Sequence, residues 1–122
     1  MTEEEIVSFI QTHMRSLWTL ELLLVLASDP NRAWTADELV REMRSSAVAV
    51  REALNDLRGA GLIRQEPEAH YRFAPASPEL EELAASIRSA YSARPTTVVR
   101  AIFSAPEDKL RIFADAFKFR KE

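Results

Sequence analysis

The first apolar residues of the chain recur at helical spacing. They form a single stripe: Ile6, Phe9 and Ile10. Thr2 and Glu5 have the Thr-x-x-Glu spacing of a capping box, in which two side chains satisfy free backbone amides at a helix start. The sequence therefore predicts an N-terminal helix within residues 1–15.

The next segment, residues 16–27, is apolar on nearly every side of a helix. A helix of this kind is buried on most of its surface. Asp29-Pro30-Asn31 follows and is expected to end it. We interpret this segment as the central core helix.

Two short helices separated by a tight turn are expected next. Thr35 and Glu38 form a second capping box, so the first of these helices covers about residues 36–43. Ser45 and Ser46 follow directly, and serine is favoured at the N-cap of a new helix.

The second of these helices has a defined inner face and a defined end. Its apolar positions recur at helical spacing: Val50, Ala53, Leu54 and Leu57. Gly61 is expected to take the left-handed conformation of a Schellman motif, in which Leu62 folds back on Leu57. A helix from Ser46 to about Ala60 is thus indicated at both ends.

A β-hairpin is predicted after this helix. Residues 62–66 and 70–74 are short segments on either side of Pro67-Glu68-Ala69. Tyr71 and Phe73 alternate with polar neighbours, as in a strand with one buried face.

Residues 77–122 are expected to form further helices. Ser77-Pro78 begins one with proline at its favoured first position, and Arg94-Pro95 ends it. Residues 98–103 are apolar and of ambiguous type, and we interpret them as a helix because no partner strand is in view. A third capping box, Ser104 to Glu107, opens the last helix.

Helix, turn, helix and hairpin is the order of a winged helix-turn-helix domain. The segment LVREMRSSAVAVREALNDLRGAGLIRQ, residues 39–65, resembles the corresponding part of MarR-type bacterial transcriptional regulators, and the resemblance extends over residues 34–73. The positions that carry it are Leu39, Ser46, Val50, Leu54, Leu57, Gly61, Leu62 and Ile63.

The fold class implied is mainly α with a small β-hairpin wing, a winged helix-turn-helix with extra N- and C-terminal helices. At 122 residues the chain is expected to be a single domain. Within residues 1–122, the N-terminal helix occupies 1–15, the winged helix-turn-helix core 16–75 and the C-terminal helices 77–122.

The resemblance implies that the chain binds double-stranded DNA. In such folds the second helix enters the major groove, where arginine can bond guanine and asparagine can bond adenine. The outward positions of that helix are Ser46, Ala47, Ala49, Arg51, Glu52 and Asn55. Arginines expected to surround it and contact phosphates are Arg41, Arg44, Arg64 and Arg72.

The charge pattern leaves a second interpretation open. The net charge is −3, and residues 41–72 hold six arginines against five acidic residues, so that region is only weakly basic. Glu52 replaces a basic or neutral residue of related regulators, and the hairpin tip, residues 66–69, is acidic. The alternative is a winged-helix protein-interaction module that docks on a regulatory protein without binding DNA.

The terminal segments suggest a homodimer. More apolar surface gathers near the C-terminus than one short helix buries against its own domain. The residues expected to contact a second copy are Ile6, Phe9, Ile10, Phe103, Phe113, Phe117 and Phe119. The alternative is that the phenylalanines complete the core of a single protomer.

Other functional classes find little support in the sequence. The chain has no cysteine, and its two histidines are far apart, so we expect no metal and no cofactor. Its two glycines, near a helix end, form no phosphate loop, and no catalytic grouping stands out, which argues against an enzyme. The acidic start and the short apolar runs favour a cytoplasmic protein without a membrane span.

Overall fold

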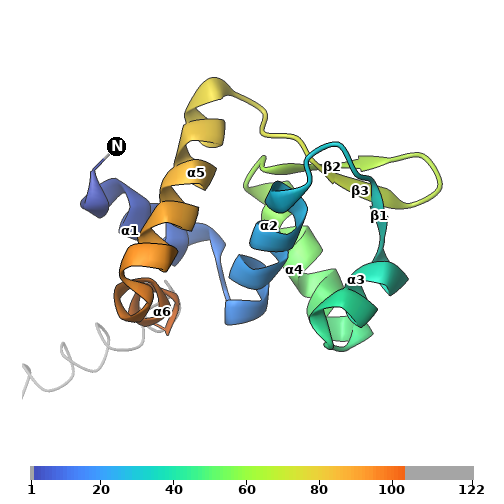
Figure 1. Cartoon of the computed structure of the whole chain (residues 1–122), viewed down its shortest axis with the longest axis horizontal. Coiled ribbons are helices and arrows are strands. Elements are labelled where there is room, and N and C mark those ends of the chain that lie inside the picture. The colour runs from blue at the N-terminus through green and yellow to red at the C-terminus, as the bar shows by residue number, and fades with distance from the viewer. Residues whose placement is uncertain (1, 104–122) are drawn as a thin grey trace, which may run out of the picture.

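The structure is a computed structural model, and it describes residues 2–103. It is mainly helical with a small three-stranded antiparallel sheet, an architecture compatible with a winged-type fold (Figure 1). The elements in chain order are α1 (Glu3–His13), α2 (Leu17–Ser28), β1 (Trp34–Thr35), α3 (Ala36–Met43), α4 (Ala47–Gly59), β2 (Ile63–Glu66), β3 (His70–Phe73), α5 (Pro78–Ala93) and α6 (Pro95–Phe103).

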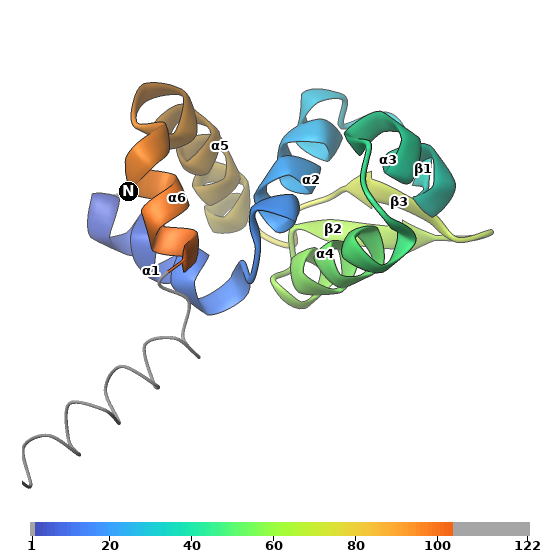
Figure 2. The same ribbon diagram turned by 90° about the horizontal axis from the view of Figure 1, so that it is seen from below.

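The described chain has two groups of elements. Figure 2 shows α1, α5 and α6 together on one side, and α3, α4 and the sheet on the other, with α2 between the groups. Helix α2 packs mainly on α4 and also contacts α5. It is therefore the central helix that its continuous apolar sequence predicted, and both groups share one core.

The predicted helix starts are confirmed by hydrogen bonds. The Thr2 hydroxyl accepts from the Glu5 amide at 3.2 Å, and the Thr35 hydroxyl accepts from the Glu38 amide at 3.1 Å. Each glutamate in turn accepts from the backbone amide of its threonine, and this hydrogen bond lowers the pKa of both Glu5 and Glu38. The capping boxes thus satisfy amides that have no partner within the helix.

The predicted end of α4 is also confirmed. The Leu62 amide donates to the Leu57 carbonyl at 3.1 Å, and the Gly61 amide donates to the Arg58 carbonyl at 3.0 Å. These are the two hydrogen bonds of a Schellman motif. Gly61 has φ +79°, and a Cβ there would lie 3.1 Å from Leu80 Cδ1, so glycine is needed at this position.

The sheet contains one strand that the sequence did not predict. Its order is β1-β3-β2, with Trp34 opposite Tyr71 and Ile63 opposite Phe73. The hairpin β2–β3 is therefore confirmed, and β3 is the central strand of the sheet. The short strand β1 directly precedes α3 and pairs with the half of β3 that is nearest the hairpin turn.

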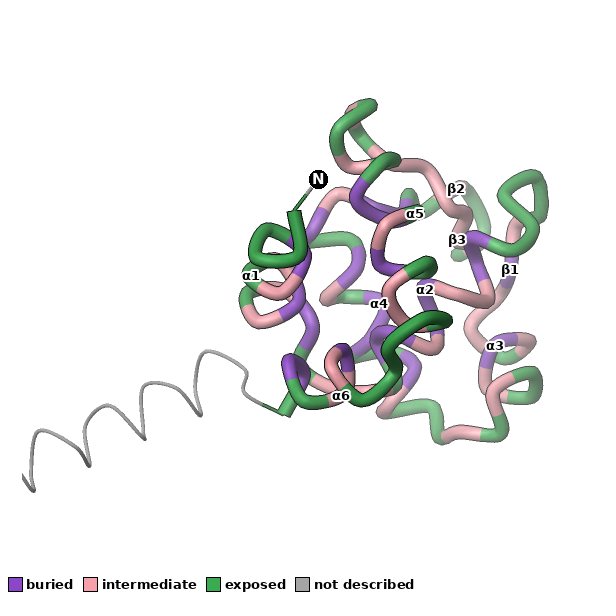
Figure 3. Tube along the Cα trace, turned by 60° about the vertical axis from the view of Figure 1, so that its left-hand side comes forward, coloured by how far each residue is buried: buried purple, intermediate pink, exposed green. Residues whose placement is uncertain are grey.

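The core contains most of the residues expected in it. Leu20, Leu54, Leu57 and Leu62 are all buried. Leu24 of α2 and Tyr71 of β3 are only half-buried and pack against this core. In Figure 3 the buried segments run through the inner faces of the helices, and the hairpin tip and the α3–α4 turn are largely exposed.

The C-terminal part of the described chain agrees with the sequence pattern. Ser77 caps α5 by accepting from the Leu80 amide at 3.2 Å, and Pro78 occupies the first turn. The ambiguous apolar segment is helix α6, which buries Val98, Ala101 and Ile102. The expected last helix, from Ser104 onward, lies outside the described residues.

Candidate nucleic-acid interface

A sharp turn between α3 and α4 sets the direction of α4. Arg44 has φ 52° and ψ 46°, the left-handed conformation, and it ends α3. Ser46 then caps α4, because its hydroxyl accepts from the Ala49 amide at 3.1 Å. Ser45 behaves differently: its hydroxyl is buried and has no hydrogen-bond partner among the described residues. Of the two serines that the sequence offered as caps, Ser46 is the cap.

Helix α4 is amphipathic, and its outer face contains the residues expected there. Its inner face buries Val50, Ala53, Leu54 and Leu57. The exposed residues at its start and along its outer face are Ser46, Ala47, Val48, Arg51, Glu52 and Asn55, and Ala49 is half-exposed. The helical spacing therefore placed the outward set correctly, although the sequence interpretation overlooked Val48, which is 56% exposed.

Unpaired guanidinium groups lie around this outer face. Arg41, Arg44, Arg51 and Arg58 are exposed, and none of them forms an ion pair with a carboxylate within residues 2–103. Unpaired guanidinium groups are available to bind phosphate or base edges without first breaking an ion pair. The exposed carboxylates on α3 and α4 are Asp37, Glu42 and Glu52, so the excess of positive charge is small.

The two hairpin arginines are already paired. Arg64 and Arg72 lie opposite each other across β2 and β3, and both donate to the Glu66 carboxylate, at 2.8 Å and 3.0 Å. Hydrogen bonds from Arg64 and Arg72 lower the pKa of Glu66. Arg72 also donates to the Asn31 carbonyl. The cluster therefore combines two cations with one anion, and its guanidinium groups are less available than the sequence implied.

A polar hollow beside α4 was not predicted. It is lined by Arg15, Ser16, Glu52, Asn55 and Asp56. Asp56 holds the start of α2 against α4, because it accepts from the Thr19 hydroxyl at 3.0 Å and lies 3.6 Å from the Arg15 guanidinium. The sequence contained one signal for this hollow, an arginine directly before the N-cap position of the core helix. It did not show that α4 lies beside that arginine.

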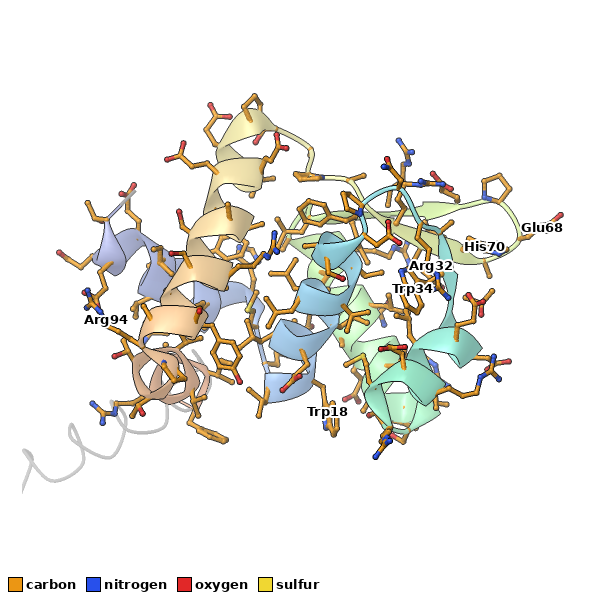
Figure 4. The ribbon with its side chains drawn as sticks, in the orientation of Figure 1. Trp18, Arg32, Trp34, Glu68, His70 and Arg94 are labelled. Carbon is orange, nitrogen blue, oxygen red and sulfur yellow. The ribbon has the colours of Figure 1, made fainter. Side chains whose placement is uncertain are left out.

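Strand β1 and the start of α3 are joined by an aromatic and an ionic contact of Arg32. Arg32 lies over the ring of the buried Trp34, 3.4 Å from its centroid, and pairs with Glu38 at 3.7 Å. Figure 4 shows Arg32, Trp34 and His70 close together near the turn end of the hairpin, with Glu68 at its tip. These contacts link β1 to α3, and β1 in turn pairs with β3 of the hairpin.

Each histidine contacts a residue close to it in the sequence. The His13 ring packs on Phe9, with centroids 4.5 Å apart, and His70 Nδ1 lies 3.2 Å from the Pro67 carbonyl. Within residues 2–103, no three His, Cys, Asp or Glu side chains are grouped so that they could hold a metal ion.

The residues expected to contact a second copy differ in how far they are buried. Ile6 and Ile10 are buried inside the protomer, where α1 packs on α6, α5 and α4, so this part of the expectation is corrected. Phe9 is half-buried against the same core. Phe103 is 68% exposed at the end of α6, and the remaining expected dimer residues, Phe113, Phe117 and Phe119, lie outside the described residues.

Searches against protein-family models, curated proteins and solved structures found no significant match. In the described part of the chain, no helix has both the length and the apolar character needed to cross a membrane. The functional argument therefore rests on the geometry of the α3–α4 pair and the hairpin.

Proposed function

We propose that the chain is a sequence-specific DNA-binding transcriptional regulator with a winged helix-turn-helix, acting as a homodimer. The observation that carries this proposal is the outer face of α4. Arg51, Asn55 and the Ser46 cap are exposed on it while the opposite face is buried, and it is flanked by arginines that form no ion pair with a described residue. A helix presented in this way has the form of a major-groove recognition helix.

Each residue of the interface has a distinct role in this proposal. Arg51 bonds guanine and Asn55 bonds adenine, since both side chains form paired hydrogen bonds to those base edges. Arg41 and Arg44, which form no ion pair with a described residue, contact phosphates beside α4. Arg64 and Arg72 contribute less, because each shares its charge with Glu66.

A second candidate function is a winged-helix module that docks on a protein. The observation that favours it is the charge of the hairpin: Glu66 neutralises part of the arginine charge, and Glu68 projects at the tip (Figure 4). An acidic tip repels the phosphates that flank a minor groove. In this alternative Glu52 and Glu68 contact a basic partner.

Selection from random DNA duplexes with the full chain distinguishes the two candidates. The DNA-binding proposal predicts enrichment of one sequence, with an affinity that falls linearly with the logarithm of salt concentration. Absence of any enriched sequence, together with the absence of salt-sensitive binding to genomic fragments, would remove it and leave the protein-docking candidate.

A further inference from the structure

Val48 is an exposed apolar residue at the start of α4. Its side chain is 56% exposed, and it is not among the hydrophobic residues that pack against the core. Valine is also a poorer helix former than alanine at an exposed helix position. Neither packing within residues 2–103 nor the stability of α4 therefore accounts for valine at this position.

The neighbours of Val48 define what kind of group fits against it. Ala47 and Ala49 flank it, so the side chains of the first turn of α4 offer no hydrogen-bonding group after Ser46, whose hydroxyl is already engaged by the Ala49 amide. Arg44 precedes this turn and Arg51 follows it, both exposed and without a carboxylate partner among the described residues. The surface is thus a small apolar tip between two available cations.

One group in the DNA major groove matches such a tip, the C5-methyl group of a pyrimidine. Each A·T pair presents this methyl group through its thymine, and apolar side chains contact it. Phosphates and guanine edges, which guanidinium groups bind, lie close by in the same groove.

We infer that Val48 contacts the C5-methyl group of a thymine, so the DNA sites bound by this chain contain a thymine facing the first turn of α4. This inference rests on the proposed function and adds a sequence requirement to it. It assigns specificity to a residue without hydrogen-bonding capacity, beside the direct base contacts of Arg51 and Asn55.

The test replaces single thymines by deoxyuridine in the duplex selected from random DNA, which removes only the methyl group. Each half-site should contain one thymine whose replacement weakens binding of the wild-type chain. Replacing that thymine in one half-site should weaken binding about fourfold, the value for burial of one methyl-sized group. The Val48→Ala chain should bind both duplexes equally. Arg51→Ala is the matched control on the same helix: it should weaken binding to both duplexes and preserve the fourfold ratio.

The C5-methyl group of 5-methylcytosine occupies the same place in the groove. A duplex with a 5-methylcytosine·guanine pair at that position should bind wild-type protein about fourfold more tightly than one with unmodified cytosine. Equal binding of the two cytosine duplexes would mean that a C5-methyl group at that position does not contact Val48, and would overturn the inference.

Three further outcomes are decisive. If deoxyuridine has no effect at any thymine of the selected site, the inference fails and the DNA-binding function stands. If Val48→Ala retains the fourfold ratio, another residue contacts the methyl group and the inference fails. If no duplex is selected at all, both the function and the inference fail. Circular dichroism of Val48→Ala, expected to show a melting temperature that is unchanged or slightly higher, excludes a folding defect.

Discussion

Gly59 and Gly61 lie two residues apart at the end of α4, but only Gly61 is in a conformation and a position that require glycine. A Cβ at Gly59 would have no atom within 4 Å, whereas Gly61 is left-handed and close to Leu80. We expect Gly59→Ala to raise the free energy of unfolding by about 0.5–1 kcal/mol and Gly61→Ala to lower it by at least about 1–2 kcal/mol. Chemical denaturation of both variants measures the difference, and equal effects would contradict the Schellman geometry.

Glu66 and Glu68 provide a second matched pair. Glu66→Gln removes the carboxylate shared by Arg64 and Arg72, while Glu68→Gln removes the same charge from the hairpin tip, where no ion pair is formed with a described residue. We expect Glu66→Gln to raise affinity for all DNA more than Glu68→Gln does, and to steepen the salt dependence. Equal effects on DNA binding would mean that the hairpin arginines do not reach phosphate.

The same pair has a pH signature. The pKa of Glu66 is lowered in the folded chain, so its contribution to stability is complete above the usual pKa of glutamate and is lost as the pH falls through the folded value. Thermal melts should therefore show a smaller loss of stability on acidification for Glu66→Gln than for wild type. Glu68→Gln should follow the wild-type profile.

These pairings could not be predicted from the sequence. The alternation in the hairpin indicated which residues share a face, but the register that places Glu66 between Arg64 and Arg72 depends on the three-residue turn. In that turn both Glu68 and Ala69 are left-handed, with φ 63° and 57°. Residue types alone do not specify such a turn, because neither residue favours that conformation.

At the scale of elements, the α3–α4 turn depends on two serines with different roles. Ser46→Ala should lower the free energy of unfolding by about 1 kcal/mol, because α4 loses its cap. Ser45→Ala removes a buried hydroxyl that has no partner among the described residues, so stability should be unchanged or higher. Denaturant titrations of both variants check this. A larger loss of stability for Ser45→Ala than for Ser46→Ala would mean that Ser46 is not the cap of α4.

The elements that the sequence predicted are those specified by residues three to five positions apart. The capping boxes at Thr2 and Thr35 and the Schellman motif at Gly61 act over such distances, and all three formed. Strand β1 was missed because its two residues are a strand only through pairing with β3, which is distant in sequence. The outer face of α4 could be predicted from helical spacing. The polar hollow beside α4 could not, because its residues come from two elements that are distant in sequence.

At the scale of the whole molecule, the stripe of α1 illustrates a limit of sequence patterns. A hydrophobic stripe indicates that a helix face is covered, but not whether the same chain or a second copy covers it. Here α6 and α5 cover Ile6 and Ile10. Phe103 is the described member of the expected interface with a largely exposed side chain.

The oligomeric state tests the dimer directly. We expect light scattering at micromolar concentration to give twice the mass of one chain, and Phe103→Ser to shift the equilibrium toward the protomer, because it removes apolar surface from the interface. The folded content by circular dichroism should not change, since Phe103 is 68% exposed. A protomer mass for the wild-type chain would contradict the homodimer.

The most direct test of the proposed function compares two arginines on α4. Arg51 lies on the first half of the exposed face and Arg58 on its last turn, and both are exposed without an ion pair to a described residue. Binding of each variant to the selected duplex and to random duplex is measured by fluorescence anisotropy at several salt concentrations. Arg51→Ala should weaken binding to the selected duplex by about 1–3 kcal/mol while random duplex changes little. Arg58→Ala should have a small effect that is equal on both. Equal losses for the two variants on both duplexes, or no binding by the wild-type chain, would contradict base recognition by α4.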